Sequence, residues 1–297
     1  MLIMEQIKGV YAASLSILDD NLALDIENTI KHAENIIDLG CHGAVFFGST
    51  GQSQLIPLGE KIQLINNLPR SRYKDKFIIG TGLNSLGDNI NLMKISKSLG
   101  FNKFLIMPPA YYKYGHDDVI NFYTKIIEEI NECKIILYNF EKLSGYKFTE
   151  ECIKKLVQKF PKQIIGVKDS SYNLYENLKI DNFSVMPGSE SKLLKGLESG
   201  CCGIITATTN VTASLAREVY DSFINKSPQN MNQKLCDVRE TFEKYNLISG
   251  LHTFMVQKNI IYKNILPPLK LLSGQDKNEL LSNLKKLDFN IENLKAA

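Results

Sequence analysis

Hydrophobic and polar positions follow two patterns along the chain, short apolar runs and longer amphipathic stretches. The short runs are rich in Val, Ile, Phe and Leu and end in Gly, Pro, Ser, Thr or Asn. Continuous apolar runs of this kind are typical of strands that are buried on both faces of a parallel sheet. The predicted strands are Gly9–Ser14, Gly43–Phe47, Phe77–Thr81, Lys103–Met107, Lys134–Asn139, Ile164–Asp169, Ser184–Pro187 and Gly203–Ala207.

The stretches between these runs carry apolar residues near helical spacing. In the first of them Leu24, Ile30 and Ile37 share one face, and Gly40 follows as a stop signal. Thr149 is a plausible N-cap for a later helix. The predicted helices are Asn21–Leu39, Pro57–Leu68, Ser85–Leu99, Asp117–Ile130, Thr149–Phe160 and Glu190–Leu197.

Eight strands, each followed by a helix, predict an α/β fold of the closed (β/α)8 type, the TIM barrel. The alternative is an open doubly wound sheet, which more often carries Gly-x-Gly-x-x-Gly after its first strand. The first turn here, Ser14–Asp20, contains no glycine. Because the strand pattern stops after Ala213, we expect residues 1–215 to form the barrel. Residues 216–297 are expected to form a C-terminal helical extension packed on it, with a break at Pro267–Pro268.

Composition and charge narrow the class of protein. The 297 residues are 44% hydrophobic and carry a formal charge of only +3, so we expect neither nucleic acid nor a membrane as partner. No apolar stretch reaches about 18 residues and no signal peptide is recognised. The six cysteines form no C-x-x-C pair and there are four histidines, so no metal site is expected. Together these features favour a cytoplasmic protein.

The residues that end the strands are the candidates for chemistry, because the active site of this fold lies at the C-terminal ends of the strands. Lys168 ends an apolar strand, where burial disfavours the ammonium and the neutral amine can attack a ketone to form an imine. Alternatively, Lys168 points to solvent or pairs with Asp169. Tyr138 ends the neighbouring strand and is a candidate proton relay, or else a core-edge tyrosine.

A small-residue turn, Gly48-Ser49-Thr50-Gly51, follows the second predicted strand. Its consecutive backbone N–H groups and hydroxyls suit a carboxylate, which a Schiff-base enzyme acting on a 2-keto acid must hold. An ordinary glycine-rich turn is the alternative.

Taken together, these residues resemble the family of N-acetylneuraminate lyase and dihydrodipicolinate synthase. The similarity covers nearly the whole chain and depends on the order and spacing of several motifs. They are G-S-T-G at 48–51, Pro109 to Tyr112, Tyr138-Asn139 with Ser144-Gly145, G-V-K-D at 166–169, Gly188 and the segment Gly203 to Asn210. The resemblance implies a (β/α)8 barrel with a helical extension, a homotetramer built as a dimer of dimers, and no metal or organic cofactor.

The resemblance also implies roles for individual residues. Lys168 would form the Schiff base with pyruvate and Tyr138 would shuttle protons. Ser49 and Thr50 would bind the keto-acid carboxylate, with Thr50 also in the hydroxyl relay. Tyr111 would complete that relay in the neighbouring subunit's site. The backbone near Gly188 and Ile205 would line the pyruvate pocket.

Departures from the family pattern bear on the substrate. Leu143 stands where dihydrodipicolinate synthases place an arginine, and leucine cannot hold a carboxylate. Leu143-Ser144-Gly145 is similar to N-acetylneuraminate lyases, but of their acidic and hydroxyl groups only one acid is kept, at Glu190. We therefore expect a shorter substrate, a 2-keto-3-deoxy sugar acid that is cleaved to, or formed from, pyruvate and an aldehyde, with Glu190 contacting its hydroxyls. Glu141, in place of the usual proline, has no explanation.

Other activities stay open at this point. N-acetylneuraminate lyase is the first alternative. The others are a dihydrodipicolinate synthase, a dehydratase that acts on 2-keto-3-deoxy acids through the same imine, and a catalytically silent barrel that binds a keto acid. Trapping of a pyruvate adduct distinguishes the enzymes from the silent barrel.

Overall fold

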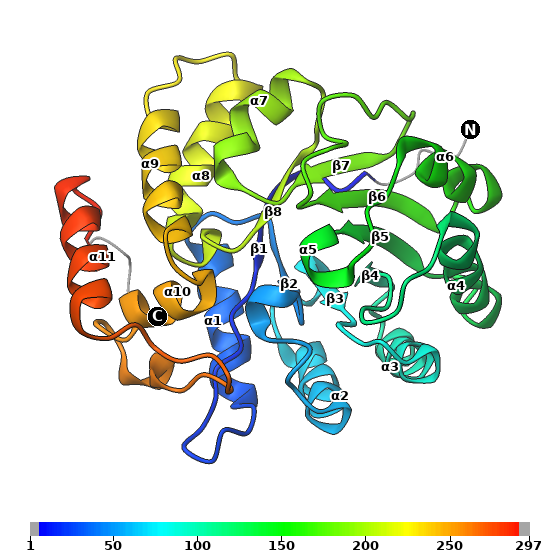
Figure 1. Cartoon of the computed structure of the whole chain (residues 1–297), viewed down its shortest axis with the longest axis horizontal. Coiled ribbons are helices and arrows are strands. Elements are labelled where there is room, and N and C mark those ends of the chain that lie inside the picture. Colours follow the sequence, from blue (N-terminus) through cyan, green and yellow to red (C-terminus); the bar gives the residue numbers. More distant parts are fainter. Residues whose placement is uncertain (1–5, 291–297) are drawn as a thin grey trace.

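The strands form one parallel barrel, as predicted. The computed structural model describes residues 6–290, and its strands follow one another around the barrel in the order β7-β6-β5-β4-β3-β2-β1-β8 (Figure 1). The strands are β1 (Gly9–Ala13), β2 (Gly43–Phe46), β3 (Phe77–Gly80), β4 (Lys103–Ile106), β5 (Lys134–Asn139), β6 (Ile164–Asp169), β7 (Ser184–Pro187) and β8 (Gly203–Thr206).

Backbone hydrogen bonds close the ring between its two end strands. The N–H of Cys202, which precedes β8, donates to the carbonyl oxygen of Val185 in β7 at 3.0 Å. The carbonyl of Cys202 in turn accepts from Gly9 of β1 at 2.8 Å. The sheet therefore has nearly no free edge, and all strand ends that could carry chemistry meet on one rim.

Helices surround the strands (Figure 1). They are α1 (Ile26–Asp38), α2 (Leu58–Asn67), α3 (Leu86–Ser98), α4 (His116–Glu129), α5 (Glu141–Ser144), α6 (Glu150–Lys159), α7 (Leu193–Glu198) and α8 (Thr209–Ile224). Thr149 caps α6 as expected, since its hydroxyl accepts from the N–H of Cys152. Helix α1 begins later than predicted because Asp25 caps it, accepting from the N–H of Asn28.

The expectation of a helix after every strand is wrong at β6. The 170–183 connection consists of turns. The buried carboxylate of Asp169 accepts from the N–H groups of Leu174 and Tyr175 at 2.9 and 3.0 Å, which folds the chain back directly after the strand. The helix predicted from Glu190 is also split, into a 3-10 turn at Glu190–Lys192 and the short α7.

The C-terminal part is helical and packs on the barrel. It contains α9 (Asn232–Glu243), α10 (Leu247–Met255), a 3-10 turn at Ile260–Lys263 and α11 (Gly274–Lys286). Its apolar side chains form one core with Leu15 and Ile17, which follow β1. Helix α8 runs across the 215/216 boundary expected above. We propose the α8–α9 connection as the division between the barrel and the extension.

The interior of the barrel is filled by inward-facing side chains such as Val45, Leu105, Ile136 and Met186. Each such buried side chain contributes about 1.5–3 kcal/mol relative to exposure. Between Ile135 and Ile136 the register of β5 against β6 shifts by one residue, an irregularity of the kind that a β-bulge produces. Beyond this shift Tyr138 pairs directly with Lys168.

Within residues 6–290, none of the helices combines the length and the apolar character that crossing a bilayer would require.

Candidate active site

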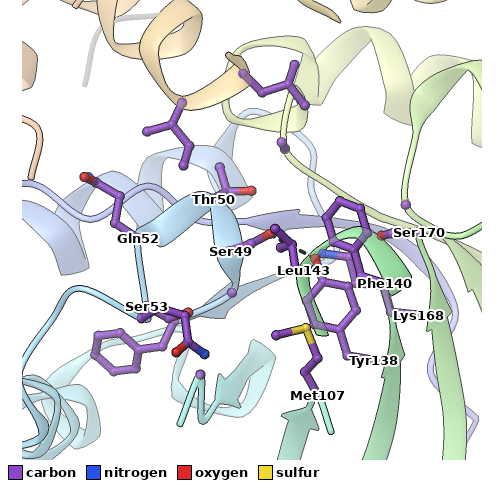
Figure 2. Close-up of a pocket in the computed structure, with 18 of the residues that line it drawn as sticks. Ser49, Thr50, Gln52, Ser53, Met107, Tyr138, Phe140, Leu143, Lys168 and Ser170 are labelled. Carbon is purple, nitrogen blue, oxygen red and sulfur yellow. Dashed lines mark hydrogen bonds between the residues drawn. The ribbon is translucent and has the colours of Figure 1, made fainter. Parts of the chain in front are cut away.

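A pocket of about 480 Å³ opens at the C-terminal ends of the strands, where the sequence placed the candidate chemistry. Figure 2 shows residues from several strand ends around it. Its lining includes Ser49, Thr50, Tyr138, Leu143, Lys168 and Gly188 of the predicted site. The barrel therefore brings together six residues that lie up to 139 positions apart, from residue 49 to residue 188.

Lys168 reaches the pocket from the end of β6. Its side chain is only 3% exposed, and Nζ lies 4.3 Å from the centre of the Tyr138 ring. Among residues 6–290, no aspartate or glutamate forms an ion pair with it. The amine is thus sheltered from bulk water and lies beside an aromatic face, which is a suitable place for a nucleophilic lysine.

Asp169 does not pair with Lys168, because successive side chains of a strand point to opposite faces. Its carboxylate accepts from Asn139 Nδ2 at 2.8 Å in addition to the two amides in the 170–183 connection. Burial raises the pKa of the Asp169 carboxyl, while these donors oppose the change. Both alternatives for Lys168, solvent exposure and a pair with Asp169, are therefore inconsistent with the geometry.

The hydroxyl of Tyr138 is hydrogen-bonded to Ser49 Oγ at 2.9 Å, shown by the dashed line in Figure 2. Either oxygen can be the donor, so a proton can move between them. The family resemblance implied Thr50, rather than Ser49, as a member of the hydroxyl relay. Thr50 lines the pocket and is buried, but its hydroxyl is not the partner of Tyr138 in this structure.

The turn that carries Ser49 and Thr50 is strained at both ends. Phe47 and Gln52 have φ of 54° each, in the left-handed region that costs non-glycine residues energy. Tyr172, another lining residue, has φ of 57°. Unfavourable backbone conformations of this kind gather at functional sites, where the surrounding structure enforces them.

Gly188 lines the pocket at a position where a side chain would not fit without a shift of its neighbour. A Cβ built there would lie 2.1 Å from Ser170 Oγ and 3.2 Å from Ser170 Cα. The segments that follow β6 and β7 therefore approach each other closely at the pocket.

Glu190, which we expected to contact substrate hydroxyls, is placed differently. It is 0% exposed and does not line the pocket. Its carboxylate accepts from Arg239 Nη1 at 3.0 Å and from Thr206 Oγ1 at 2.7 Å. Burying a carboxylate requires compensation of this kind, and the compensation leaves Glu190 unavailable to a ligand.

Two other predicted residues also lie apart from the pocket. Ile205 is fully buried in the barrel interior and is absent from the lining. Tyr111 is 90% exposed and adopts φ of 88°, with its ring edge-on to Tyr112. An exposed, strained tyrosine cannot serve the site of its own chain from that position.

Several lining residues were missed by sequence reasoning. Arg239, Leu247, Ile248 and Leu269 belong to the C-terminal extension, and Tyr172 to the 170–183 connection. The four residues of the extension follow no strand, so the rule that locates active sites at strand ends could not find them. Tyr172 lies three residues after β6, but it is not among the residues that end the strand. The left-handed conformation of Tyr172 has no sequence signal either.

The chain is similar to known proteins in both sequence and structure. Residues 6–287 match the model of the dihydrodipicolinate synthetase family. An uncharacterized DapA-like lyase of Chloroflexus aurantiacus is 27% identical, covering 74% of this chain and 76% of the relative. A 2-dehydro-3-deoxy-D-gluconate/2-dehydro-3-deoxy-phosphogluconate aldolase of Picrophilus torridus is 27% identical over 75% of this chain and 85% of the relative.

Solved structures share the fold. The 4-hydroxy-tetrahydrodipicolinate synthase of Methylacidiphilum fumariolicum SolV superposes with a TM-score of 0.88, at 20% identity, covering 98% of this chain and 99% of the other. YagE from E. coli K12, solved in complex with pyruvate, has a TM-score of 0.82 at 21% identity, covering 96% of this chain and 100% of the other.

Proposed function

Because the chain belongs to the dihydrodipicolinate synthetase family, whose members are carbon–carbon lyases, we propose that it is a lyase in which Lys168 forms an imine with pyruvate. The observation that carries the proposal is the position of the Lys168 amine. It lies in a pocket, sheltered from water, and directly beside the Tyr138 ring.

The reaction proceeds through the imine as an electron sink. In the cleavage direction the amine attacks the ketone carbon of a 4-hydroxy-2-keto acid and water leaves. When the C4 hydroxyl loses its proton, the C3–C4 bond breaks and an aldehyde is released. The electron pair of the broken C3–C4 bond is taken up by the imine, which becomes an enamine. Protonation at C3 and hydrolysis of the imine release pyruvate and restore Lys168. The reverse order joins pyruvate to the aldehyde.

Tyr138 is the proposed proton shuttle, with Ser49 as its hydrogen-bonded partner. Thr50 and the backbone amides of the 48–51 turn hold the keto-acid carboxylate. Because Ser49 Oγ already contacts the phenol, it is the residue of the turn best placed to pass a proton on.

A 2-keto-3-deoxy sugar acid remains the second, more specific candidate. It is supported by the name of the Picrophilus torridus relative. The residue-level argument through Glu190 no longer supports it, because that carboxylate is engaged by Arg239. The argument for an N-acetylneuraminate lyase is weakened for the same reason. A dehydratase uses the same imine and is distinguished by its product.

A dihydrodipicolinate synthase activity requires a cation for the second carboxylate. Leu143 lines the pocket at the position where that cation was expected. The guanidinium of Arg239 also reaches the lining, but it contacts Glu190 at 3.0 Å and Glu243 at 2.7 Å. Two carboxylates already neutralise it, so it is not free to bind a third.

Borohydride trapping tests the proposal. The full-length protein is incubated with pyruvate and reduced, and peptides are mapped by mass spectrometry. We expect a reduced pyruvate adduct on Lys168 that is absent from Lys168→Ala. The matched control is Lys61→Met, which removes another buried lysine and should leave the Lys168 adduct. An unmodified Lys168 at saturating pyruvate would contradict the proposal and favour the silent barrel.

A further inference from the structure

The pocket lining combines polar groups with aliphatic side chains. Lys168, Tyr138, Ser49 and Thr50 supply polar groups around the place of imine formation. The lining also contains five aliphatic side chains, Leu55, Leu143, Leu247, Ile248 and Leu269, here called the aliphatic wall. Pyruvate alone does not need this wall, because a three-carbon acid fills only part of a 480 Å³ pocket.

The aliphatic wall has no structural purpose in the core. Of its members, Leu55, Leu143, Ile248 and Leu269 belong to none of the hydrophobic clusters formed by the described residues. Leu55 is 40% exposed and Leu143 is 45% exposed. Aliphatic side chains from four separate segments, two of them exposed, converge on one concavity, which indicates a surface that is covered by a ligand.

Two polar side chains of the lining, Arg239 and Asn246, are already engaged. Arg239 is held between Glu190 and Glu243. The side-chain oxygen of Asn246 accepts from the N–H groups of Ile248 and Ser249, which caps α10. A polyol packed against the aliphatic wall itself would lose hydrogen bonds to water and find no partner on these five side chains, which is costly.

We infer that the aldehyde half of the substrate carries an apolar body, alkyl or aryl, that packs against the aliphatic wall. This inference rests on the proposed function, because the aldehyde reacts with the enamine formed at Lys168. In the condensation direction C3 of the enamine bonds to the aldehyde carbon. The aldehyde oxygen takes a proton, and hydrolysis of the imine releases a 4-hydroxy-2-keto acid with the apolar group on C4.

The test compares two aldehydes in the condensation with pyruvate, benzaldehyde and glyceraldehyde. For the unmodified protein we expect kcat/KM to be at least about 10-fold higher with benzaldehyde, since an apolar contact of this size is worth one to two factors of ten. Leu143→Asn and Ile248→Asn should each lower the benzaldehyde-to-glyceraldehyde ratio by about 10-fold. Because the two substitutions lie in separate elements, a folding defect in one variant would still leave the other as a test.

The matched control is Ile260→Asn, which introduces the same amide at an aliphatic residue that is 65% exposed and lies outside the pocket. It should leave the ratio unchanged. A preference for glyceraldehyde, with the pyruvate adduct formed normally, would overturn the inference and leave the proposed function standing. Absence of the adduct would overturn both. Equal ratios in all four proteins would also overturn the inference.

Discussion

Tyr138 and Lys168 occupy directly paired positions of β5 and β6, and the lysine nitrogen lies 4.3 Å from the centre of the tyrosine ring. The pairing follows from the parallel register at the ends of the two strands. It places the proposed nucleophile and the proposed proton shuttle side by side, without any contribution from a flexible loop.

Replacing Lys168 by alanine should abolish turnover, because no other amine in the described part of the chain lines the pocket. We expect kcat to fall by at least about 10³-fold, as when a covalent nucleophile is removed. Steady-state assays of pyruvate release from 4-hydroxy-2-keto acids measure the effect. Lys142→Ala, which removes an exposed lysine, is the control. Residual activity near the unmodified level in Lys168→Ala would contradict the imine mechanism.

Replacing Tyr138 by phenylalanine should lower kcat by roughly 10²–10⁴-fold while pyruvate binding changes little, because the ring is kept and only the proton relay is lost. Ser49→Ala should have a smaller effect in the same direction, since Ser49 acts through the Tyr138 hydroxyl. The pyruvate dependence of borohydride trapping reports binding separately from turnover. Equal losses in binding and in kcat would assign Tyr138 a purely structural role.

Replacing Glu190 by glutamine should destabilise the protein by about 3 kcal/mol, since it leaves the buried Arg239 guanidinium with less compensation. The comparison is Glu243→Gln, which removes the half-exposed partner of the same arginine and should cost about 1 kcal/mol or less. Urea unfolding measures both. If Glu190→Gln instead keeps its stability and loses activity with hydroxylated substrates, then Glu190 contacts substrate after all.

Lys61 should make stability depend on pH. Its Nζ is buried and donates to the carbonyl oxygen of Thr81 at 2.8 Å, and burial lowers the pKa of Lys61 to about 7. Above pH 7 the folded protein releases this proton while the unfolded chain keeps it until about pH 10.5. The unfolded state then binds more protons, so the contribution of Lys61 to stability rises with pH across this window.

The measurement compares unfolding of the unmodified protein and Lys61→Met at several pH values. From pH 7 to pH 9 the free energy of unfolding of the unmodified protein should rise by about 2 kcal/mol relative to that of the variant. If the difference in free energy of unfolding between the two proteins stays constant with pH, the pKa of Lys61 is the same in the folded and unfolded states.

Tyr111 is proposed to complete the site of a neighbouring subunit, in a homotetramer built from dimers. Tyr111→Phe and Lys168→Ala should then each be inactive alone. Refolding the two together should recover activity, up to roughly a quarter of the unmodified level by random pairing. The control is a mixture of the two variants that are refolded separately, so that no subunits are exchanged. No recovery in a verified mixed oligomer would argue against a shared site, and a monomeric protein in sedimentation would argue against the assembly.

The strand order, the barrel and the pair of Lys168 and Tyr138 were accessible from the sequence, because they depend on local signals. Apolar runs mark strands that are buried on both faces, and a general rule of this fold then places their last residues on one rim. The direct pairing of Tyr138 with Lys168 depends in addition on a register shift between β5 and β6, which the apolar pattern does not show.

Other properties arose only when distant segments packed together. Glu190 lost its expected role because Arg239, 49 residues later, neutralises it, and α10 with Leu269 supplied much of the aliphatic wall. Periodicity reports whether a residue faces the interior of its own element. It does not report which remote side chain compensates a buried charge or completes a pocket, because those choices are made by the geometry of packing.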